Sequence, residues 1–238
     1  MSLFTRKTTS LALIFLIAYT CTSFAQSTTQ KDNILSKKEI SRGWKLLFDG
    51  TSTTGWHNYL KTGVSGWQVK NGVLFTEGKN GDIVTDEDYR DFELTIDWKI
   101  EKQGNSGIFY FVVEDPVNAR IHQSGPEFQI IDEENYPQKL NDNQVTGSAS
   151  DVLKPYSLPA NPIGSWNSTR IKSKDGKIEH WLNGKKVLSY DIHSAEWKEA
   201  VQNSKFAEFN FARVTNGKIG LQDHGAFVAY KNVKIRRL

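Results

Sequence analysis

The alternation of apolar and polar side chains predicts a chain built almost entirely of strands. In residues 91–100, every second side chain from Phe92 to Ile100 is apolar, and the side chains between them are polar. This period of two is typical of an antiparallel strand with one face in the core and the other in solvent. Gly107–Val113 is apolar throughout, which indicates a strand covered on both sides.

Turn residues divide the rest of the chain into further short strands. Asn71-Gly72 and Asn183-Gly184 each lie between two apolar runs, and Asn-Gly is the strongest short signal for a β-hairpin. Ser194–Ser204 is the one convincing helix, with Ser194 as its N-cap, and Ser36–Ile40 predicts a single helical turn. The remaining predicted strands are Trp44–Phe48, Trp67–Val69, Val73–Phe75, Glu127–Asp132, Trp166–Ser173, Ile178–Leu182, Lys186–Tyr190, Lys218–Gln222, Phe227–Tyr230 and Val233–Arg237.

About a dozen short strands with regularly spaced turns and one short helix predict an all-β fold, a sandwich of two antiparallel sheets. We expect one domain over residues 40–238, because the composition does not shift along this stretch and sandwiches of this size are common. Glu133–Pro162 is long, polar and without a period, and a loop of that length in a compact domain often carries function.

The strand at Glu127–Asp132 carries the first candidate site. Its alternation turns Phe128 and Ile130 toward the core and sets Glu127 and Gln129 together on the opposite face. A carboxylate beside an amide on a rigid element suits a polar site, and a solvated strand face is the alternative interpretation. Asp132 is the last residue of this stretch, at the strand's end, where it can also cap a turn.

A second polar pair occurs near the C-terminus. If residues 220–225 are extended, Gln222 and His224 face one side while Leu221 faces the core. Asn105 precedes the apolar strand at Gly107, where a small polar side chain can line a sheet edge. His180 is a further candidate, although a histidine in a strand is usually a hydrogen-bonded structural residue.

Charge and composition exclude several classes of function. The formal charge is +3, and removal of Arg6 and Lys7 with the first 25 residues leaves +1, so we expect no nucleic acid as a partner. Seven Trp and eight Tyr favour a carbohydrate partner, because sugar rings stack on aromatic faces. No P-loop, dinucleotide fingerprint, His-Glu-x-x-His, Cys-x-x-Cys or Gly-x-Ser-x-Gly motif is present, so we expect no cofactor and no dedicated metal site.

The first 25 residues have the features of a secretory signal peptide. Arg6 and Lys7 precede the apolar run Leu11–Ala18, which is too short to span a bilayer, and Ala25 ends a stretch suited to signal peptidase. We expect cleavage after Ala25, a flexible tether over residues 26–39, a periplasmic or secreted protein, and no membrane attachment afterwards. A lipid anchor on Cys21, the only cysteine, is the less favoured alternative because Tyr19 and Thr20 before it are bulky.

Six motifs in order resemble one known family. The sequence is similar to the 3-keto-disaccharide hydrolase domain family over about residues 40–238. The motifs are Gly43–Gly50 followed by Gly55-Trp56, Asn105–Ile108, Glu127–Asp132, Trp166-Asn167, His180–Gly184 and Leu221–Gly225. The resemblance implies a concanavalin A-like jelly-roll sandwich and an exported bacterial protein acting on glycosides oxidised at C3. It maps the family's motifs onto Glu127, Gln129, Asp132, Gln222 and His224.

A 3-keto sugar permits cleavage by elimination. The ketone acidifies the proton at C2, so a base removes it, the aglycone leaves from C1, and water adds to the enone. We expect Glu127 and His224 to be the catalytic acid and base, in either order. Asn105, Gln129, Asp132, His180 and Gln222 are the candidate substrate-binding residues. Two alternatives stay open: a non-catalytic carbohydrate-binding domain, and an ordinary glycosidase that uses Glu127 and Asp132.

Overall fold

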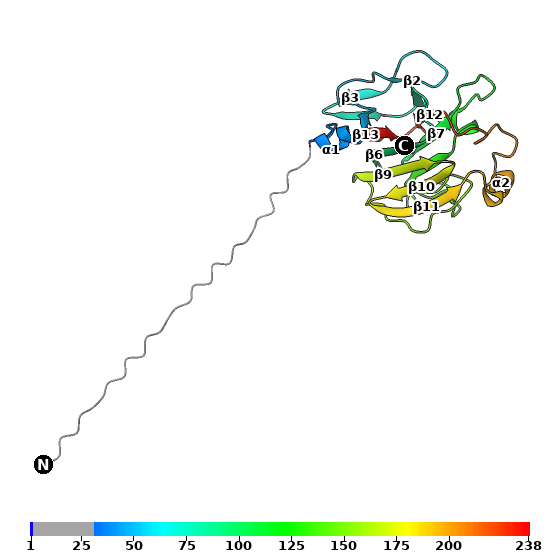
Figure 1. Ribbon diagram of the computed structural model, residues 1–238. Coiled ribbons are helices and arrows are strands. Elements are labelled where there is room, and N and C mark those ends of the chain that lie inside the picture. Colours follow the sequence, from blue (N-terminus) through cyan, green and yellow to red (C-terminus); the bar gives the residue numbers. More distant parts are fainter. Residues whose placement is uncertain (2–30) are drawn as a thin grey trace. The chain divides into compact units, whose positions relative to one another are not determined.

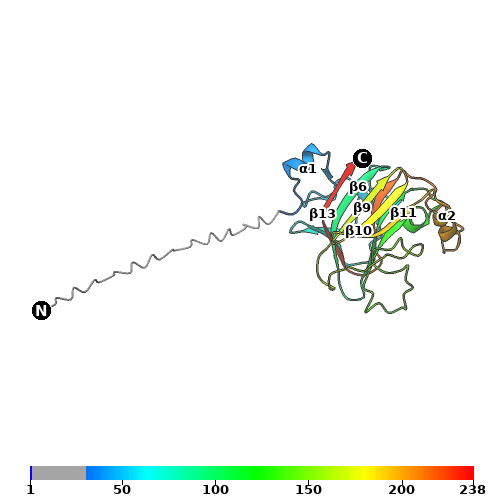
Figure 2. The ribbon, with the colours of Figure 1, turned by 60° about the horizontal axis from the view of Figure 1, so that its bottom comes forward.

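The computed structural model describes Met1 and residues 31–238, and two antiparallel sheets with a hydrophobic core between them make up residues 31–238 (Figures 1 and 2). The predicted signal peptide at 1–25, Cys21 and the tether residues 26–30 lie outside the described residues, apart from Met1. None of the described helices has the length and apolar character needed to cross a bilayer.

The larger sheet has eight strands. Its order is β11-β10-β9-β6-β13-β4-β3, with β1 also paired to β13, and Figure 2 shows β13, β6, β9, β10 and β11 running side by side. The strands are β1 (Lys45–Leu46), β3 (Gln68–Lys70), β4 (Val73–Thr76), β6 (Phe92–Ile100), β9 (Asn167–Lys174), β10 (Lys177–Leu182), β11 (Lys185–Asp191) and β13 (Val228–Arg237).

The smaller sheet has five strands in the order β2-β5-β12-β7-β8. They are β2 (Trp56–Asn58), β5 (Ile83–Thr85), β7 (Asn105–Val112), β8 (Glu127–Ile131) and β12 (Lys218–Leu221). The helices are α1 (Lys37–Ser41), the short 3₁₀ helix η1 (Ile121–Gln123) and α2 (Ala195–Gln202), which lies beside β11 in both ribbon views. This architecture confirms the predicted all-β sandwich of two antiparallel sheets.

Period-two alternation places the core residues as the sequence predicts. In β6 all five apolar side chains from Phe92 to Ile100 are buried in the main core, and Phe128 and Ile130 of β8 meet them from the other sheet. Both Asn-Gly pairs form two-residue turns with positive φ at each position, 52° and 76° at Asn71-Gly72 and 48° and 79° at Asn183-Gly184. Such turns match the twist of the strands they connect.

Two segments differ from the sequence prediction. Residues 31–39 are not a tether, because Asn33 is buried and exchanges two backbone-to-side-chain hydrogen bonds with Asn232, at 2.7 and 2.8 Å. Ser36 and Glu39 form a capping box that begins α1 at the predicted helical turn. The two predicted C-terminal strands form one strand, β13, because Asn232 at φ 53° makes a bulge rather than a turn.

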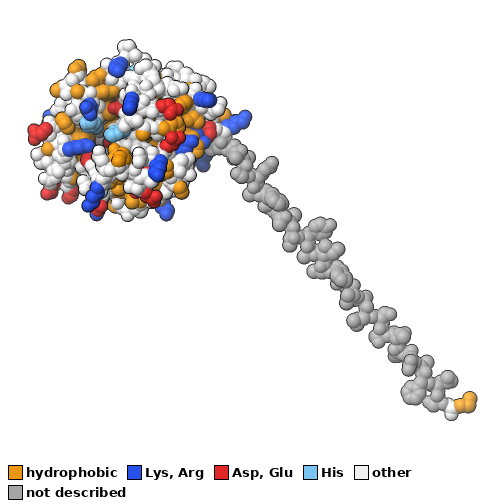
Figure 3. All heavy atoms as spheres, turned by 180° about the vertical axis from the view of Figure 1, so that it is seen from behind, with side chains coloured by type: hydrophobic (Ala, Val, Ile, Leu, Met, Phe, Trp, Pro, Cys, Tyr) orange, Lys and Arg blue, Asp and Glu red, His pale blue; other side chains and the backbone are white. Residues whose placement is uncertain are grey.

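Charges of both signs are spread over the surface. Figure 3 shows Lys and Arg side chains scattered among Asp and Glu side chains on one face of the molecule, with no single basic patch there. That distribution is unlike the continuous positive surface typical of proteins that bind nucleic acid.

Candidate active site

The polar pair predicted on β8 lies on the outer face of the smaller sheet. Cross-strand pairing sets Gln129 opposite Gly107 and Glu127 opposite Phe109. Because neighbouring strands share their pleat, Asn105, Gly107, Glu127 and Gln129 face the same way, away from the core. The amide of Gln129 donates to Asn105 Oδ1 at 3.4 Å, so two of the predicted substrate-binding residues touch.

A cavity of about 560 Å³ lies over this face, and five of the seven predicted site residues line it: Asn105, Glu127, Gln129, Gln222 and His224. Gln222 directly follows β12, and its backbone N–H donates to Gly107 O at 3.0 Å, which brings the second polar pair beside the first. The other lining residues are Asp82, Arg120, His122, Ile131, Tyr136, Gln138, Lys139, Leu140, Asn141, Gln144, Ser150, Asp151, Lys205 and Asp223.

Glu127 is the most unusual group in the cavity. The residue is only 7% exposed, and its side-chain Oε1 is buried without a hydrogen-bond partner. Burial raises the pKa of Glu127 to about 8, against the opposing effects of the Lys205 charge and the Ser150 hydroxyl. The carboxyl therefore holds its proton at neutral pH, which suits a group that donates a proton to a bound molecule.

The position of Glu127 depends on a glycine. A Cβ on Gly107 would lie 1.9 Å from Glu127 Oε1 and 2.6 Å from its Cδ, so the carboxyl occupies the space that any other residue would fill. This requirement comes from the pairing of β7 with β8, and the residue pattern alone does not reveal it.

Replacing Gly107 with Ala is therefore expected to push the Glu127 carboxyl aside and lower catalytic turnover about a hundredfold, the typical effect of a misplaced catalytic group. The measurement is kcat on a 3-keto-glucoside, the substrate class that the sequence resemblance implies. Gly55→Ala is the control: Gly55 has a φ of 86°, so this change strains the backbone, but no atom lies within 4 Å of the added methyl group. Turnover within twofold of wild type in the Gly107 variant would contradict this placement of Glu127.

The segment that carries Gln222 and His224 is held by Asp223. The Asp223 carboxylate accepts hydrogen bonds from the backbone N–H groups of Lys79 at 2.9 Å and Asn80 at 2.6 Å, so it has the turn-fixing role that an aspartate commonly takes. Gln222 is buried and its Oε1 has no partner, whereas His224 is exposed at the rim. The amide thus lies deep in the cavity and the imidazole near its mouth.

Asp82 is a functional candidate that the sequence did not reveal. It directly precedes β5, lines the cavity, and accepts a hydrogen bond from the Asp223 N–H at 2.9 Å. Burial raises the pKa of Asp82 to about 6. Three more lining residues were missed in the same way: Arg120 and His122 come from the connection between β7 and β8, and Lys205 comes from the one between α2 and β12.

The long loop at 133–162 forms one wall of the cavity. Gly147 N donates to Gln129 O at 2.9 Å and Ser150 N to Glu127 O at 3.0 Å, so the loop covers the free edge of β8. Asp151 forms an ion pair with Lys205 and accepts from Gln144 at 2.6 Å. The loop is therefore built into the candidate site, in keeping with its unusual length.

Two predicted substrate-binding residues lie outside the cavity, which corrects their assignment. Asp132 is buried and binds Gln103 N at 2.8 Å and the Asn135 side chain at 3.1 Å, so its carboxylate fixes a turn. His180 is fully buried, with Nε2 2.8 Å from the Tyr110 hydroxyl and Nδ1 3.0 Å from Gly147 O. Burial lowers the pKa of His180 to about 4, so it is a neutral core residue.

His180→Ala is expected to lower the free energy of unfolding by about 2–4 kcal/mol, because it leaves a cavity and removes the partner of a buried hydroxyl. Urea denaturation measures this change. At a temperature where the variant is folded, KM should stay within twofold of wild type. A stable variant with a greatly raised KM would show instead that His180 contacts substrate.

No cluster of three potential metal ligands of the His, Cys, Asp or Glu type occurs within residues 31–238. The residues that line the cavity supply carboxyl, imidazole and amide groups. Two buried oxygens without partners, on Glu127 and Gln222, face this one polar space.

The sequence and fold are similar to those of known proteins. A 3-keto-disaccharide hydrolase from Bacteroides thetaiotaomicron is 32% identical in an alignment of 228 positions, and the alignment covers 82% of this chain and 79% of the relative. A crystal structure of a provisionally named glycosyl hydrolase from Parabacteroides distasonis has a TM-score of 0.85 and 42% identity, covering 87% of this chain and all of its own. A second from that organism has a TM-score of 0.64 and 27% identity, covering 82% and 99%.

The family comparison covers nearly the whole described domain. Residues 43–236 match the model of one family, and that range holds every residue that lines the cavity. The chain belongs to the family of 3-keto-alpha-glucoside-1,2-lyase-like domains.

Proposed function

We propose that this protein cleaves the glycosidic bond of 3-keto glycosides or disaccharides, with Glu127 and His224 as its acid and base. The observation that carries the proposal is Glu127, a buried carboxyl with one unpaired oxygen and a pKa raised to about 8 in a polar cavity. The family and the 3-keto-disaccharide hydrolase from Bacteroides thetaiotaomicron support the substrate class.

The reaction proceeds by elimination and hydration. A base removes the proton at C2, the electrons of that C–H bond form the C1–C2 double bond, and the C1–O bond breaks as the leaving oxygen takes a proton. Water then adds to C1 of the enone, and C2 regains a proton from solvent. The sum is hydrolysis of the glycoside without any redox change.

The raised pKa of Glu127 supports one order of the two roles. A carboxyl that holds its proton at neutral pH gives it to the leaving oxygen, which leaves His224 at the rim as the base for C2. The amides of Asn105, Gln129 and Gln222 line the same cavity and supply donors for the enolate and the sugar hydroxyls.

The alternatives are less well supported by the geometry. An ordinary glycosidase needs two facing carboxyl groups, but Asp132 is bound to backbone and Asn135 outside the cavity. Asp82 lines the cavity, so a test on unoxidised sugars is still informative. A purely sugar-binding site has no need of an unpaired buried carboxyl, because such a group costs stability.

The test compares a glucoside with its 3-keto form in D₂O. Two results together support the proposal. The aglycone is released from the keto form alone, and C2 of the product carries more deuterium than in an enzyme-free control. Release from the unoxidised glucoside would favour the ordinary glycosidase. Binding of the keto form without release would favour the carbohydrate-binding domain.

The pH dependence of kcat/KM distinguishes the two assignments of Glu127. An acid must be protonated to act, so kcat/KM is expected to fall as pH rises through about 8, where free Glu127 loses its proton. Steady-state rates between pH 6 and 9.5 provide the measurement. A rate that rises through pH 8 would mean that Glu127 is the base, with the proton donor elsewhere.

We further propose that the protein is exported and acts in the periplasm or outside the cell. The charged start, the apolar run at Leu11–Ala18 and the small residue Ala25 support this proposal. Mass spectrometry of the protein from its native cells is expected to give Gln26 as the N-terminus. A lipid on Cys21 would favour the anchored alternative, and an intact Met1 would contradict export.

A further inference from the structure

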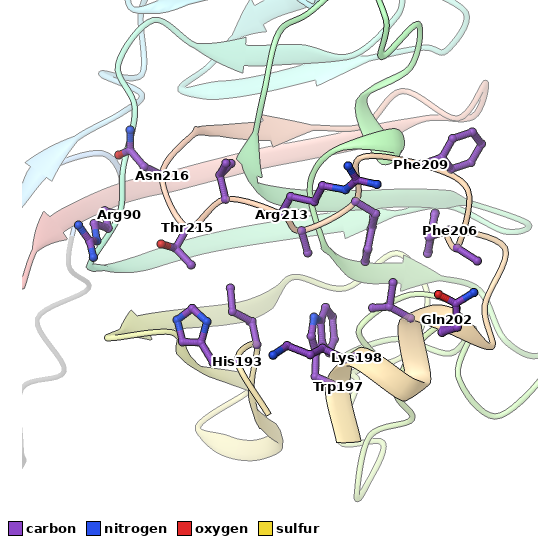
Figure 4. Close-up of a pocket in the computed structure, with 16 residues that line it drawn as sticks. Arg90, His193, Trp197, Lys198, Gln202, Phe206, Phe209, Arg213, Thr215 and Asn216 are labelled. Atoms are coloured by element: carbon purple, nitrogen blue, oxygen red, sulfur yellow. The ribbon is translucent and has the colours of Figure 1, made fainter. Parts of the chain in front are cut away.

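A second cavity, of about 720 Å³, shares no lining residue with the polar cavity of β8 except Phe206's neighbourhood (Figure 4). Figure 4 shows Trp197, Lys198 and Gln202 on α2 facing the segment at 206–216, with Arg90 and Asn216 at one end. The volume falls in the range of small-molecule binding sites, roughly 300–1,000 Å³. The proposed glycoside cleavage makes no use of this cavity.

The floor of the second cavity is aromatic. Phe206 and Phe211 stack with ring centroids 4.1 Å apart, and Trp197 stacks on Phe211 at 6.2 Å. All three are nearly buried, at 2%, 6% and 3% exposure for Phe206, Phe211 and Trp197. The Phe206 ring also lies 6.3 Å from the ring of His122, which lines the polar cavity, so Phe206 stands between the two sites.

The rim of the second cavity is positively charged. The rim residues with a positive charge are Arg90, Lys198 and Arg213. None of them forms a salt bridge to a residue in the described part of the chain. No Asp or Glu is among the described residues that line the cavity. By contrast, Lys186 and Lys218 each pair with a carboxylate elsewhere on the surface. The cavity thus combines an apolar floor with cations that lack counter-charges.

We propose that this cavity is a binding site for a small aromatic anion, a flat apolar body that carries one carboxylate or sulfonate group. The faces of Trp197, Phe206 and Phe211 stack on one another, so their ring edges line the space for the aromatic body, and the anionic group reaches the cations of the rim. A neutral aromatic molecule fills the floor but leaves the three cations unpaired. The inference stands independently of the proposed glycoside cleavage.

Two dyes with the same body test the inference. 1-Anilinonaphthalene-8-sulfonate carries the negative charge, and N-phenyl-1-naphthylamine lacks it. In fluorescence titrations of the full-length mature protein, the sulfonate is expected to bind at one saturable site, at least about tenfold more tightly than the neutral dye. Arg213→Glu and Arg90→Glu should each weaken sulfonate binding roughly tenfold and change neutral-dye binding by less than twofold.

The control variants separate this site from general charge effects and from the polar cavity. Lys70→Glu makes the same change in net charge on β3, at the opposite edge of the larger sheet from β11, and should leave sulfonate binding unchanged. Glu127→Gln should also leave it unchanged. Equal affinity for the two dyes, no saturable site, full binding in the Arg variants or equal weakening by Lys70→Glu would each overturn the inference.

Discussion

Glu127→Gln is expected to lower kcat for cleavage of a 3-keto-glucoside about a thousandfold, with little change in KM. The amide keeps the size and shape of the side chain but has no acidic proton to give to the leaving oxygen, and general acid catalysis is typically worth 10²–10⁴-fold. Oε1 of Glu127 has no hydrogen-bond partner, so the substitution breaks no contact of that atom. The loss should therefore appear in the chemical step and hardly at all in binding.

Glu133→Gln is the matched control for that experiment. Glu133 lies six residues along the chain, burial also raises its pKa, and it binds the Thr146 N–H at 2.8 Å outside the cavity. An amide oxygen can accept the same hydrogen bond, so kcat should stay within about twofold of wild type. If both variants or neither lost activity, Glu127 would not be the acid.

The residues found from sequence were those whose position follows from a simple period. Glu127 and Gln129 lie two apart on β8, and strand geometry alone places them on one face. Gln222 and His224 have the same spacing after β12, and both reach the cavity. In these cases the local backbone is regular, so the direction of a side chain can be counted from its neighbours.

The residues that were missed or misassigned depend on distant parts of the chain. Asp82 and Lys205 reach the cavity from separate connections, and no local pattern links them. His180 lies on the same face of β10 as Leu182, and both side chains are buried in the core. Asn33 looked like part of a polar tether because its partner, Asn232, is 199 residues away.

The unpaired carboxyl of Glu127 should also affect the stability of the protein. Its pKa is about 8 when folded and 4.5 for an exposed glutamate, so between these values the folded state binds more protons than the unfolded state. The contribution of Glu127 to the free energy of unfolding is therefore fully retained below pH 4.5 and is lost as pH rises toward 8. The loss is on the order of 5 kcal/mol, since each pKa unit is worth about 1.4 kcal/mol.

Glu127→Gln removes this loss, because the amide is neutral at every pH. The variant is expected to match wild type near pH 4.5 and to become more stable than wild type by several kcal/mol at pH 8.5, in urea denaturation at a series of pH values.

Glu39→Gln is expected to show the opposite dependence of stability on pH. Hydrogen bonds from Lys234 and Ser36 lower the pKa of Glu39 to about 2, so that variant is less stable above pH 4.5 and approaches wild type as pH falls toward 2. A Glu127 variant whose stability relative to wild type does not change with pH would mean that this carboxyl is ionised in the folded protein, and would remove the basis for its role as the acid.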